Sequence, residues 1–183
     1  MYISIMNDLK GDDYDVHKAV KEKFGEGRVL FQRRKINTHI LSPNPPKGKV
    51  VVTKYINGVI GNIQHGDRID FSLRINPVVS KKTAVGKRGA RKAIPAYDVE
   101  RWMNRKFIQH GFVADFTYEA EWFRESVKEG HVISLNSLMV HGVLEVLNPD
   151  SVRQALVQGI GSAKGLGFGM LHIYDTFIIP ETI

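Results

Sequence analysis

The 183-residue sequence predicts an α+β fold, because segments with strand-like and helix-like patterns alternate in two similar rounds. Each round contains a helix followed by β-branched segments whose spacing favours antiparallel strands. A stretch without acidic residues separates the two rounds. Together these observations predict two tandem ferredoxin-like (βαββαβ) units, over residues 1–78 and 96–183, joined by a basic linker over residues 79–95.

The first unit opens with an apolar strand at residues 2–6. Asp12 and Asp13 are suitable N-caps for a helix over residues 14–24, which stops at Gly25. β-Branched residues predict three further strands, at residues 29–41, 49–56 and 68–75. The turn-rich segment SPNPPKG joins the first two of these strands as a hairpin or as neighbours in the sheet.

The second unit repeats this pattern in part. Helical spacing predicts a helix over residues 97–110, closed by Gly111. Alternating residues predict strands at residues 113–123 and 131–147, and Asn148 to Ser151 form a helix-start cluster for residues 152–158. A glycine-rich segment and a last strand over residues 170–179 complete the unit.

The composition is that of a folded chain and argues against several classes of protein. Hydrophobic residues make up 43% and charged residues 25% of the sequence. No apolar run approaches the ~18 residues that a membrane span needs, and the acidic N-terminal segment is unlike a secretory signal. The lack of cysteine excludes disulfides, thiolate catalysis and cysteine-ligated zinc. We therefore expect a cytoplasmic protein without a membrane partner.

The excess positive charge is confined to one stretch. Between Phe71 and Tyr97 there are seven basic residues and no acid, whereas the rest of the chain holds 19 of each sign. Such a block is either a solvated loop or a segment that contacts nucleic-acid phosphates and gains free energy by releasing counterions. On the second interpretation, four side chains contact RNA: Lys87, Arg88, Arg91 and Lys92.

The first helix carries a polar patch beside its apolar stripe. At ~100° per residue, Val16, Val20 and Phe24 face a core, whereas another arc holds Tyr14, His17, Lys18 and Lys21. A histidine can take up and release a proton near neutral pH, and the two lysines would hold a phosphate. The patch is either a site for acid–base chemistry on a phosphodiester or an inert surface.

The glycine-rich segment at residues 158–169 is the second candidate site. Its glycines free the backbone for close approach to a ligand, and Gly159, Gly161 and Lys164 are candidate RNA contacts. The alternative is a tight helix-to-strand connection packed against the other unit. Phosphate-loop and dinucleotide patterns are absent, and the histidines lack metal-binding spacing, so we expect neither a cofactor nor a metal ion.

In combination, these segments resemble CasE, the family of CRISPR RNA-processing endoribonucleases of type I-E systems. The matching pieces are MYISIM, Tyr14-x-x-His17, FSLRINP at residues 71–77, and QGIGSAKGLGFGMLHI at residues 158–173. The resemblance runs nearly end to end and in the same order. The short connector GVIGNIQHGD departs from the family and implies that the second helix of the first unit is shortened or missing.

The resemblance implies two ferredoxin-like folds and metal-independent cleavage of precursor CRISPR RNA within its repeats. The nucleophile would be the 2′-hydroxyl beside the scissile phosphate, and the ends would be a 5′-hydroxyl and a 2′,3′-cyclic phosphate. His17 would be the general acid or base, and Tyr14 would orient the reacting group. Arg33 and Arg34 are further expected RNA contacts.

The resemblance also implies that the protein is a monomer when free, remains bound to the cleaved stem-loop RNA and joins the other subunits of the Cascade complex. The alternative is a non-catalytic subunit that only binds the RNA hairpin. A generic basic RNA-binding protein outside CRISPR systems is a third interpretation, which the glycine-rich segment disfavours.

Overall fold

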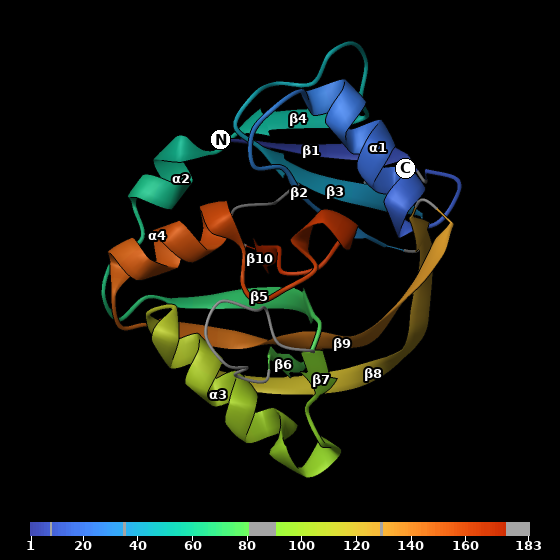
Figure 1. Ribbon diagram of the computed structural model, residues 1–183. Helices are drawn as coiled ribbons and strands as arrows, with labels where there is room; N and C mark the ends of the chain where they lie inside the picture. Colours follow the sequence, from blue (N-terminus) through green and yellow to red (C-terminus); the bar gives the residue numbers. More distant parts are fainter. Residues whose placement is uncertain (8, 35, 81–90, 129, 175–183) are drawn as a thin grey trace, which may run out of the picture.

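The computed structural model describes residues 1–7, 9–34, 36–80, 91–128 and 130–174 (Figure 1). The helices are α1 (Asp13–Phe24), α2 (Asn57–Gly61), α3 (Val99–Gln109) and α4 (Pro149–Gln158), with 3-10 turns η1 (Ala96–Asp98) and η2 (Lys164–Leu166). The strands are β1 (Tyr2–Asn7), β2 (Leu30–Arg33), β3 (Asn37–Ser42), β4 (Val52–Tyr55), β5 (Arg68–Ile75), β6 (Val78–Ser80), β7 (Arg91–Ala93), β8 (Phe112–Lys128), β9 (His131–Val146) and β10 (Leu171–Ile173). None of the described helices is long and apolar enough to cross a membrane.

The first sheet has the strand order β2-β3-β1-β4, and its paired strands are antiparallel. Helix α1 covers one face, where Val16, Val20 and Phe24 pack against Phe31 and Ile40 (Figure 1). This is the strand order of a ferredoxin-like unit. No helix lies between β3 and β4, in a part of the chain that is fully described, so this unit lacks a helix at that position. The connector at residues 58–67, where a shortened or missing helix was expected, holds most of the five-residue helix α2.

Two strand predictions in this unit were wrong. The segment at residues 29–41 was expected as one strand, but it forms the antiparallel pair β2 and β3, with Arg34 N donating to the carbonyl of Asn37. Neither Gly nor Pro occurs between the two strands, so the reversal left little trace in the sequence. The expected pairing across SPNPPKG is also absent, because β1 lies between β3 and β4 and pairs with both.

The second sheet has the order β10-β5-β9-β8 and is antiparallel throughout. In chain order, β5, α3, β8, β9, α4 and β10 make a complete βαββαβ unit. The expected fold class, α+β with tandem ferredoxin-like units, is thus confirmed.

Strand β5 requires a correction. Residues 68–75 were expected to close the first unit, yet β5 pairs along its whole length with β9 and over three residues with β10. Its residues from Phe71 to Ile75 are all buried, as expected for a central strand with neighbours on both sides. The basic stretch therefore lies between two elements of the second sheet's own unit, β5 and α3, where β6 and β7 pair at its base.

The two units share one hydrophobic core. Ile3, Leu30 and Leu41 of the first sheet belong to the same buried cluster as Phe71 of β5 and Leu156 of α4. Figure 1 shows α4 and the chain that follows it between the two sheets. Because the core is continuous, the units are held in a fixed relation, which places elements of both around the site described below.

A polar seam lies beside this core, where the two sheets meet. His39 Nδ1 on β3 is 3.0 Å from His172 Nε2 on β10, and both rings are buried. Arg34 Nη2 donates to Ser72 Oγ over 3.2 Å. Burial, with a further contribution from Arg34, lowers the pKa of His39 to about 4 and that of His172 to about 2.

We expect this histidine pair to make folding stability depend on pH. The folded chain keeps both imidazoles neutral below their usual pKa of 6.5, whereas the unfolded chain takes up protons there. The free energy of unfolding should therefore decrease as the pH falls from about 6.5 towards 4, by about 1 to 3 kcal/mol between pH 7.5 and 5.5. Urea denaturation at the two pH values measures this difference. The variant H39Q/H172Q should lose most of it, and equal wild-type stability at both values would contradict the prediction.

Candidate functional site

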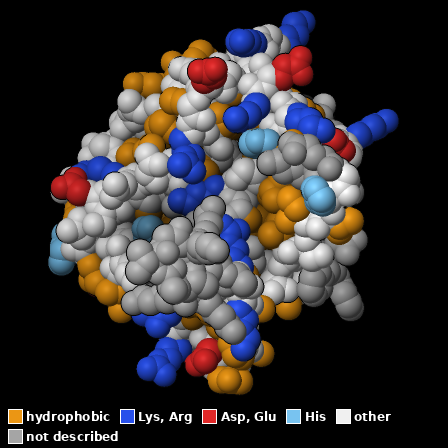
Figure 2. Space-filling model, in the orientation of Figure 1, with side chains coloured by type: hydrophobic (Ala, Val, Ile, Leu, Met, Phe, Trp, Pro, Cys, Tyr) orange, Lys and Arg blue, Asp and Glu red, His pale blue; other side chains and the backbone are white. Residues whose placement is uncertain are grey.

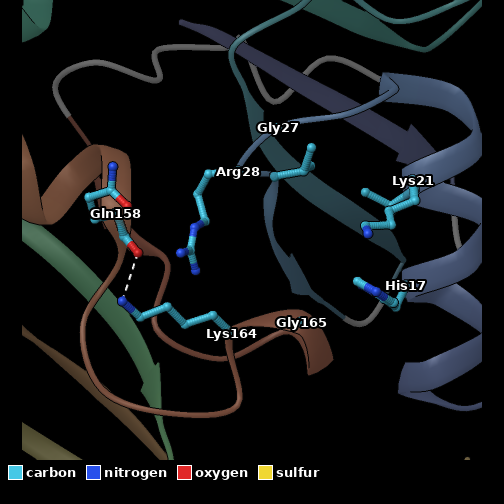
Figure 3. Close-up of a pocket in the computed structure, with 9 residues that line it drawn as sticks. His17, Lys21, Gly27, Arg28, Gln158, Lys164 and Gly165 are labelled. Atoms are coloured by element: carbon cyan, nitrogen blue, oxygen red, sulfur yellow. Dashed lines mark hydrogen bonds between the residues drawn. The ribbon is translucent and has the colours of Figure 1, made fainter.

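A groove of about 490 Å³ lies between α1 and the glycine-rich loop (Figure 3). Three parts of the chain line it: α1, the segment before β2, and the end of α4 with the loop that follows it. The lining residues are His17, Val20, Lys21, Gly27, Arg28, Val29, Gln158, Lys164 and Gly165. The groove is thus built from both ferredoxin-like units.

Local sequence signals fix the start and the rotation of α1. The Asp12 carboxylate accepts from the backbone N–H groups of Tyr14 and Asp15 over 2.8 and 3.0 Å, and the Asp15 carboxylate accepts from the Asp12 backbone N–H, which completes a capping box. Val16 and Val20 are buried against the first sheet. Because these residues face the core, His17 is turned towards the groove, as Figure 3 shows.

Of the four residues expected to share a patch on α1, two line the groove and two, Tyr14 and Lys18, do not. His17 and Lys21 line the groove. The ring of Tyr14 lies alongside that of His17, with centroids 6.3 Å apart and planes 23° from parallel. Lys18 instead turns back along the helix: its Nζ lies 4.4 Å from the Tyr14 ring centroid and 3.5 Å from a carboxylate oxygen of Asp15.

The glycine-rich loop bridges the two sheets. Ile160 N donates to the carbonyl of Gly169, and Gly169 N donates to the carbonyl of Arg74 on β5, both over 2.7 Å. On its other side the loop contacts the first unit, since a Cβ at Gly165 would lie 3.4 Å from Cε1 of His17. Gly167 has φ +81°, and a Cβ there would lie 2.9 Å from the Phe31 ring. The loop therefore lies at the junction of the two units.

The groove gathers positive charge. Lys21, Arg28 and Lys164 line it, and its lining includes no Asp or Glu. Lys164 Nζ donates to the carbonyl of Gln158 over 2.8 Å, and burial followed by the charge of Arg28 lowers the pKa of Lys164. Figure 3 shows the Arg28 side chain pointing towards Lys164, with His17 and Lys21 on α1 across the groove from both. Such a groove favours an anionic ligand beside an imidazole.

A second groove, of about 560 Å³, lies on the other side of Lys164, between α3, β6 and the glycine-rich loop. Helix α3 contributes Arg105 and Lys106, and His110 follows it as the C-cap. Lys164 lines both grooves. Burial, then the charges of Lys106 and Lys164, lowers the pKa of His110. Figure 2 shows Lys and Arg side chains gathered across the middle of this face of the molecule.

Two of the arginines predicted to contact RNA lie away from the first groove and have protein partners. Arg33 donates to the carbonyls of Leu9 and Gly11, and Arg34 donates to Ser72 and lies 5.8 Å from the Tyr174 ring centroid. Neither lines either groove described above.

The other predicted RNA contacts are distributed as follows. Arg91 and Lys92 are exposed on β7, where they pair with Ser80 and Val79 of β6. Lys87 and Arg88 lie outside the described residues. Gly161 lines the second groove, whereas Gly159 is buried, and a Cβ there would lie 2.8 Å from the carbonyl oxygen of Gly169.

Sequence reasoning missed Arg28 and the basic residues of α3. Arg28 is a single residue between a helix stop and a strand, with no spacing relation to His17. Arg105 and Lys106 look like the solvated face of an amphipathic helix. Within the part of the chain that the structure describes, no three His, Cys, Asp or Glu side chains form a group that could hold a metal ion.

Comparison with known proteins places the chain in a family. The family described as "CRISPR associated protein" matches residues 4–174. The chain belongs to this family. The resemblance to the CasE group is confirmed by a relative that is 29% identical over 124 residues, the CRISPR-associated endoribonuclease Cse3 of Thermus thermophilus. That alignment covers 61% of this chain and 57% of the relative, so it spans little more than half the length of Cse3.

Solved structures of the family share the fold. Cas6e from Escherichia coli K-12 superposes with a TM-score of 0.77 at 22% identity, covering 94% of this chain and 98% of that one. A Cse3 endoribonuclease bound to a 19-nucleotide RNA superposes with a TM-score of 0.78 at 19% identity, covering 94% and 99%. A chain of a CRISPR RNA-guided surveillance complex matches with a TM-score of 0.72 at 16% identity, covering 94% and 99%.

Proposed function

We propose that this chain is an endoribonuclease that cleaves precursor CRISPR RNA within its repeats by metal-independent attack of a 2′-hydroxyl. The observation that carries the proposal is the position of His17, which projects from α1 into a cationic groove closed by the glycine-rich loop. The Cse3 relative is named as a CRISPR-associated endoribonuclease, and family structures include one bound to RNA.

The proposed reaction needs two proton transfers and stabilisation of charge. The 2′-hydroxyl of one nucleotide attacks the adjacent phosphorus and gives up its proton, and the departing 5′-oxygen of the next nucleotide takes one up. A 2′,3′-cyclic phosphate and a 5′-hydroxyl result. His17 is the general acid or base for one of these transfers, and Tyr14, whose ring lies alongside that of His17, orients the reacting hydroxyl or the phosphate.

The cations of the groove act on the phosphate. Negative charge builds up on its non-bridging oxygens as the fifth bond to phosphorus forms. Lys21, Arg28 and Lys164 line the groove from three different segments, so they would surround such a group. Fixed donors that are already in place stabilise the transition state without reorganising during the reaction.

The RNA would extend beyond the reacting phosphate in both directions. Because Lys164 lines both grooves, we infer that one strand passes from the first groove across Lys164 to Arg105 and Lys106. The basic stretch around β6 and β7 would contact the stem of the repeat hairpin. A-form stems present phosphates and 2′-hydroxyls to a protein more readily than base edges, so backbone contacts should dominate binding.

After cleavage the protein is proposed to remain on the stem-loop and to join the other subunits of Cascade. The likeness to a chain of a CRISPR RNA-guided surveillance complex supports this part of the proposal. The test that separates an enzyme from a hairpin-binding subunit is incubation of the purified chain with a labelled repeat hairpin. Site-specific cutting supports the enzyme, and tight binding without cutting would favour the subunit.

The salt dependence of binding tests the basic stretch. Replacing Lys87, Arg88, Arg91 and Lys92 together by Ala should weaken hairpin affinity and flatten the plot of log K against log salt. The expected change in slope is about 0.7 to 0.9 for each lost phosphate contact. Fluorescence anisotropy at four salt concentrations measures the slope. An unchanged slope would support the alternative interpretation, in which this stretch is a solvated loop that does not contact RNA.

The same measurement has a matched control on α3. The double variant R105A/K106A removes two charges from the second groove and should also flatten the slope. Arg101 is exposed on the same helix but does not line that groove. Arg101→Ala should therefore leave the slope unchanged, and equal effects of all the α3 variants would indicate a general charge effect.

A further inference from the structure

One arginine on β2 binds the backbone just before α1. Arg33 Nη1 donates to the carbonyl of Gly11 and Nη2 donates to the carbonyl of Leu9, each over 2.9 Å. Nη1 also lies 3.6 Å from a carboxylate oxygen of Asp13, the first residue of α1. The side chains of Arg33 and Asp13 are 20% and 5% exposed, so water screens these contacts weakly.

The held segment leads directly into the capping box of α1. Gly11 has φ +95°, and a Cβ there would lie 2.6 Å from the Asp15 carboxylate. The backbone is therefore folded tightly against the first turn of the helix. A guanidinium that holds the carbonyls of Leu9 and Gly11 fixes where this turn begins, because Asp12, the N-cap, follows immediately.

The first two turns of α1 carry the reacting groups of the proposed site. Tyr14 is the second residue of the helix, and its backbone N–H is bound by Asp12. His17 lies one turn later, beside Gly165 of the glycine-rich loop. A shift of about 1 Å in such a group can cost on the order of 100-fold in rate, so an anchor for this turn has a direct effect on chemistry.

We propose that Arg33 is a positioning residue that sets the start of α1, and with it the placement of Tyr14 and His17, and that it does not contact RNA. The proposal rests on the proposed function and assigns Arg33 a different role from the RNA contact expected from the sequence. The planar guanidinium can reach two carbonyls at once through separate nitrogens, whereas a lysine donates from a single atom.

The test uses two variants of Arg33. Arg33→Lys keeps the charge but loses the two-carbonyl fork, and Arg33→Met loses both. Each should slow single-turnover cleavage at saturating hairpin by about 10- to 100-fold, with the hairpin Kd and its salt slope unchanged. Tyr14→Phe should slow the Arg33→Lys variant less than it slows the wild type, because the hydroxyl is already displaced. A salt slope that flattens in Arg33→Met but not in Arg33→Lys would show a phosphate contact and overturn the proposal.

A matched substitution at Arg153 controls for a loss of folding stability. Arg153 makes a similar clamp, since its guanidinium donates to the carbonyls of Ile60, Gly61 and Ile63, remote in sequence from α1 and outside the groove lining. Arg153→Lys should leave the cleavage rate at saturating hairpin within about twofold of the wild type, far from the ~10-fold minimum expected for Arg33→Lys. Equal slowing in the two variants would mean that Arg33 acts only through overall stability.

Amide hydrogen exchange provides a readout that does not depend on cleavage. Exchange at the backbone N–H groups of Tyr14 and Asp15 should accelerate in Arg33→Lys and not in Arg153→Lys. If the wild type does not cut RNA but this pattern holds, the proposed function fails while the anchoring of α1 stands. If exchange at these two groups is the same in Arg33→Lys as in the wild type, the inference is overturned.

Discussion

Replacing His17 by Ala should slow cleavage of a CRISPR repeat hairpin by at least about 100-fold, the usual cost of losing a general acid or base. Hairpin affinity should stay nearly unchanged, because Lys21, Arg28 and Lys164 still line the groove. Single-turnover cleavage at saturating protein measures the rate of the chemical step, and an equilibrium binding assay with a 2′-deoxy hairpin measures the affinity.

Two further variants test whether the effect is specific to His17. Tyr14→Phe keeps the ring that lies alongside His17 and loses only the hydroxyl, so it should slow cleavage less than His17→Ala does. His65 is an exposed histidine before β5 and does not line the groove, so His65→Ala should cut at the wild-type rate. If His17→Ala also cuts like the wild type, the patch on α1 is merely a surface and the reaction occurs elsewhere.

A single 2′-deoxy nucleotide immediately 5′ of the cleaved bond should abolish cleavage of the hairpin. In the proposed reaction that hydroxyl is the nucleophile, so its removal leaves no group to attack the phosphorus. The same substitution one nucleotide further upstream is the control, and it should allow cutting at close to the normal rate. Cleavage of the deoxy substrate at the normal rate would mean that another nucleophile, such as water, attacks the phosphate.

The parts of the site that the sequence predicted are those governed by local rules. The apolar spacing of Val16, Val20 and Phe24 determines which face of α1 is buried, and all three are buried as expected. The same spacing turned His17 towards the groove. The glycine-rich loop was recognisable because several closely spaced glycines, such as Gly167 at φ +81°, permit a backbone path that other residues resist.

The parts that the sequence did not predict depend on contacts between distant segments. The sequence of β5 predicts a strand but does not indicate which sheet it joins. Only its pairing with β9 and β10 shows that it belongs to the second sheet. Arg28 enters the groove because α1, β2 and the glycine-rich loop meet there. Arg33 and Arg34 are adjacent basic residues in the sequence, but successive side chains in an extended chain point to opposite sides. Arg33 therefore contacts the start of α1, whereas Arg34 contacts Ser72.

The chemical ends of the cut RNA test the central claim most directly. The wild-type chain would be incubated with the repeat hairpin in excess EDTA, and the fragments would be analysed by mass spectrometry. If the chain's own side chains activate the neighbouring 2′-hydroxyl, cleavage persists in EDTA and yields one fragment ending in a 2′,3′-cyclic phosphate and one beginning with a 5′-hydroxyl. Loss of cleavage in EDTA, or fragments with a 3′-hydroxyl and a 5′-phosphate, would contradict it.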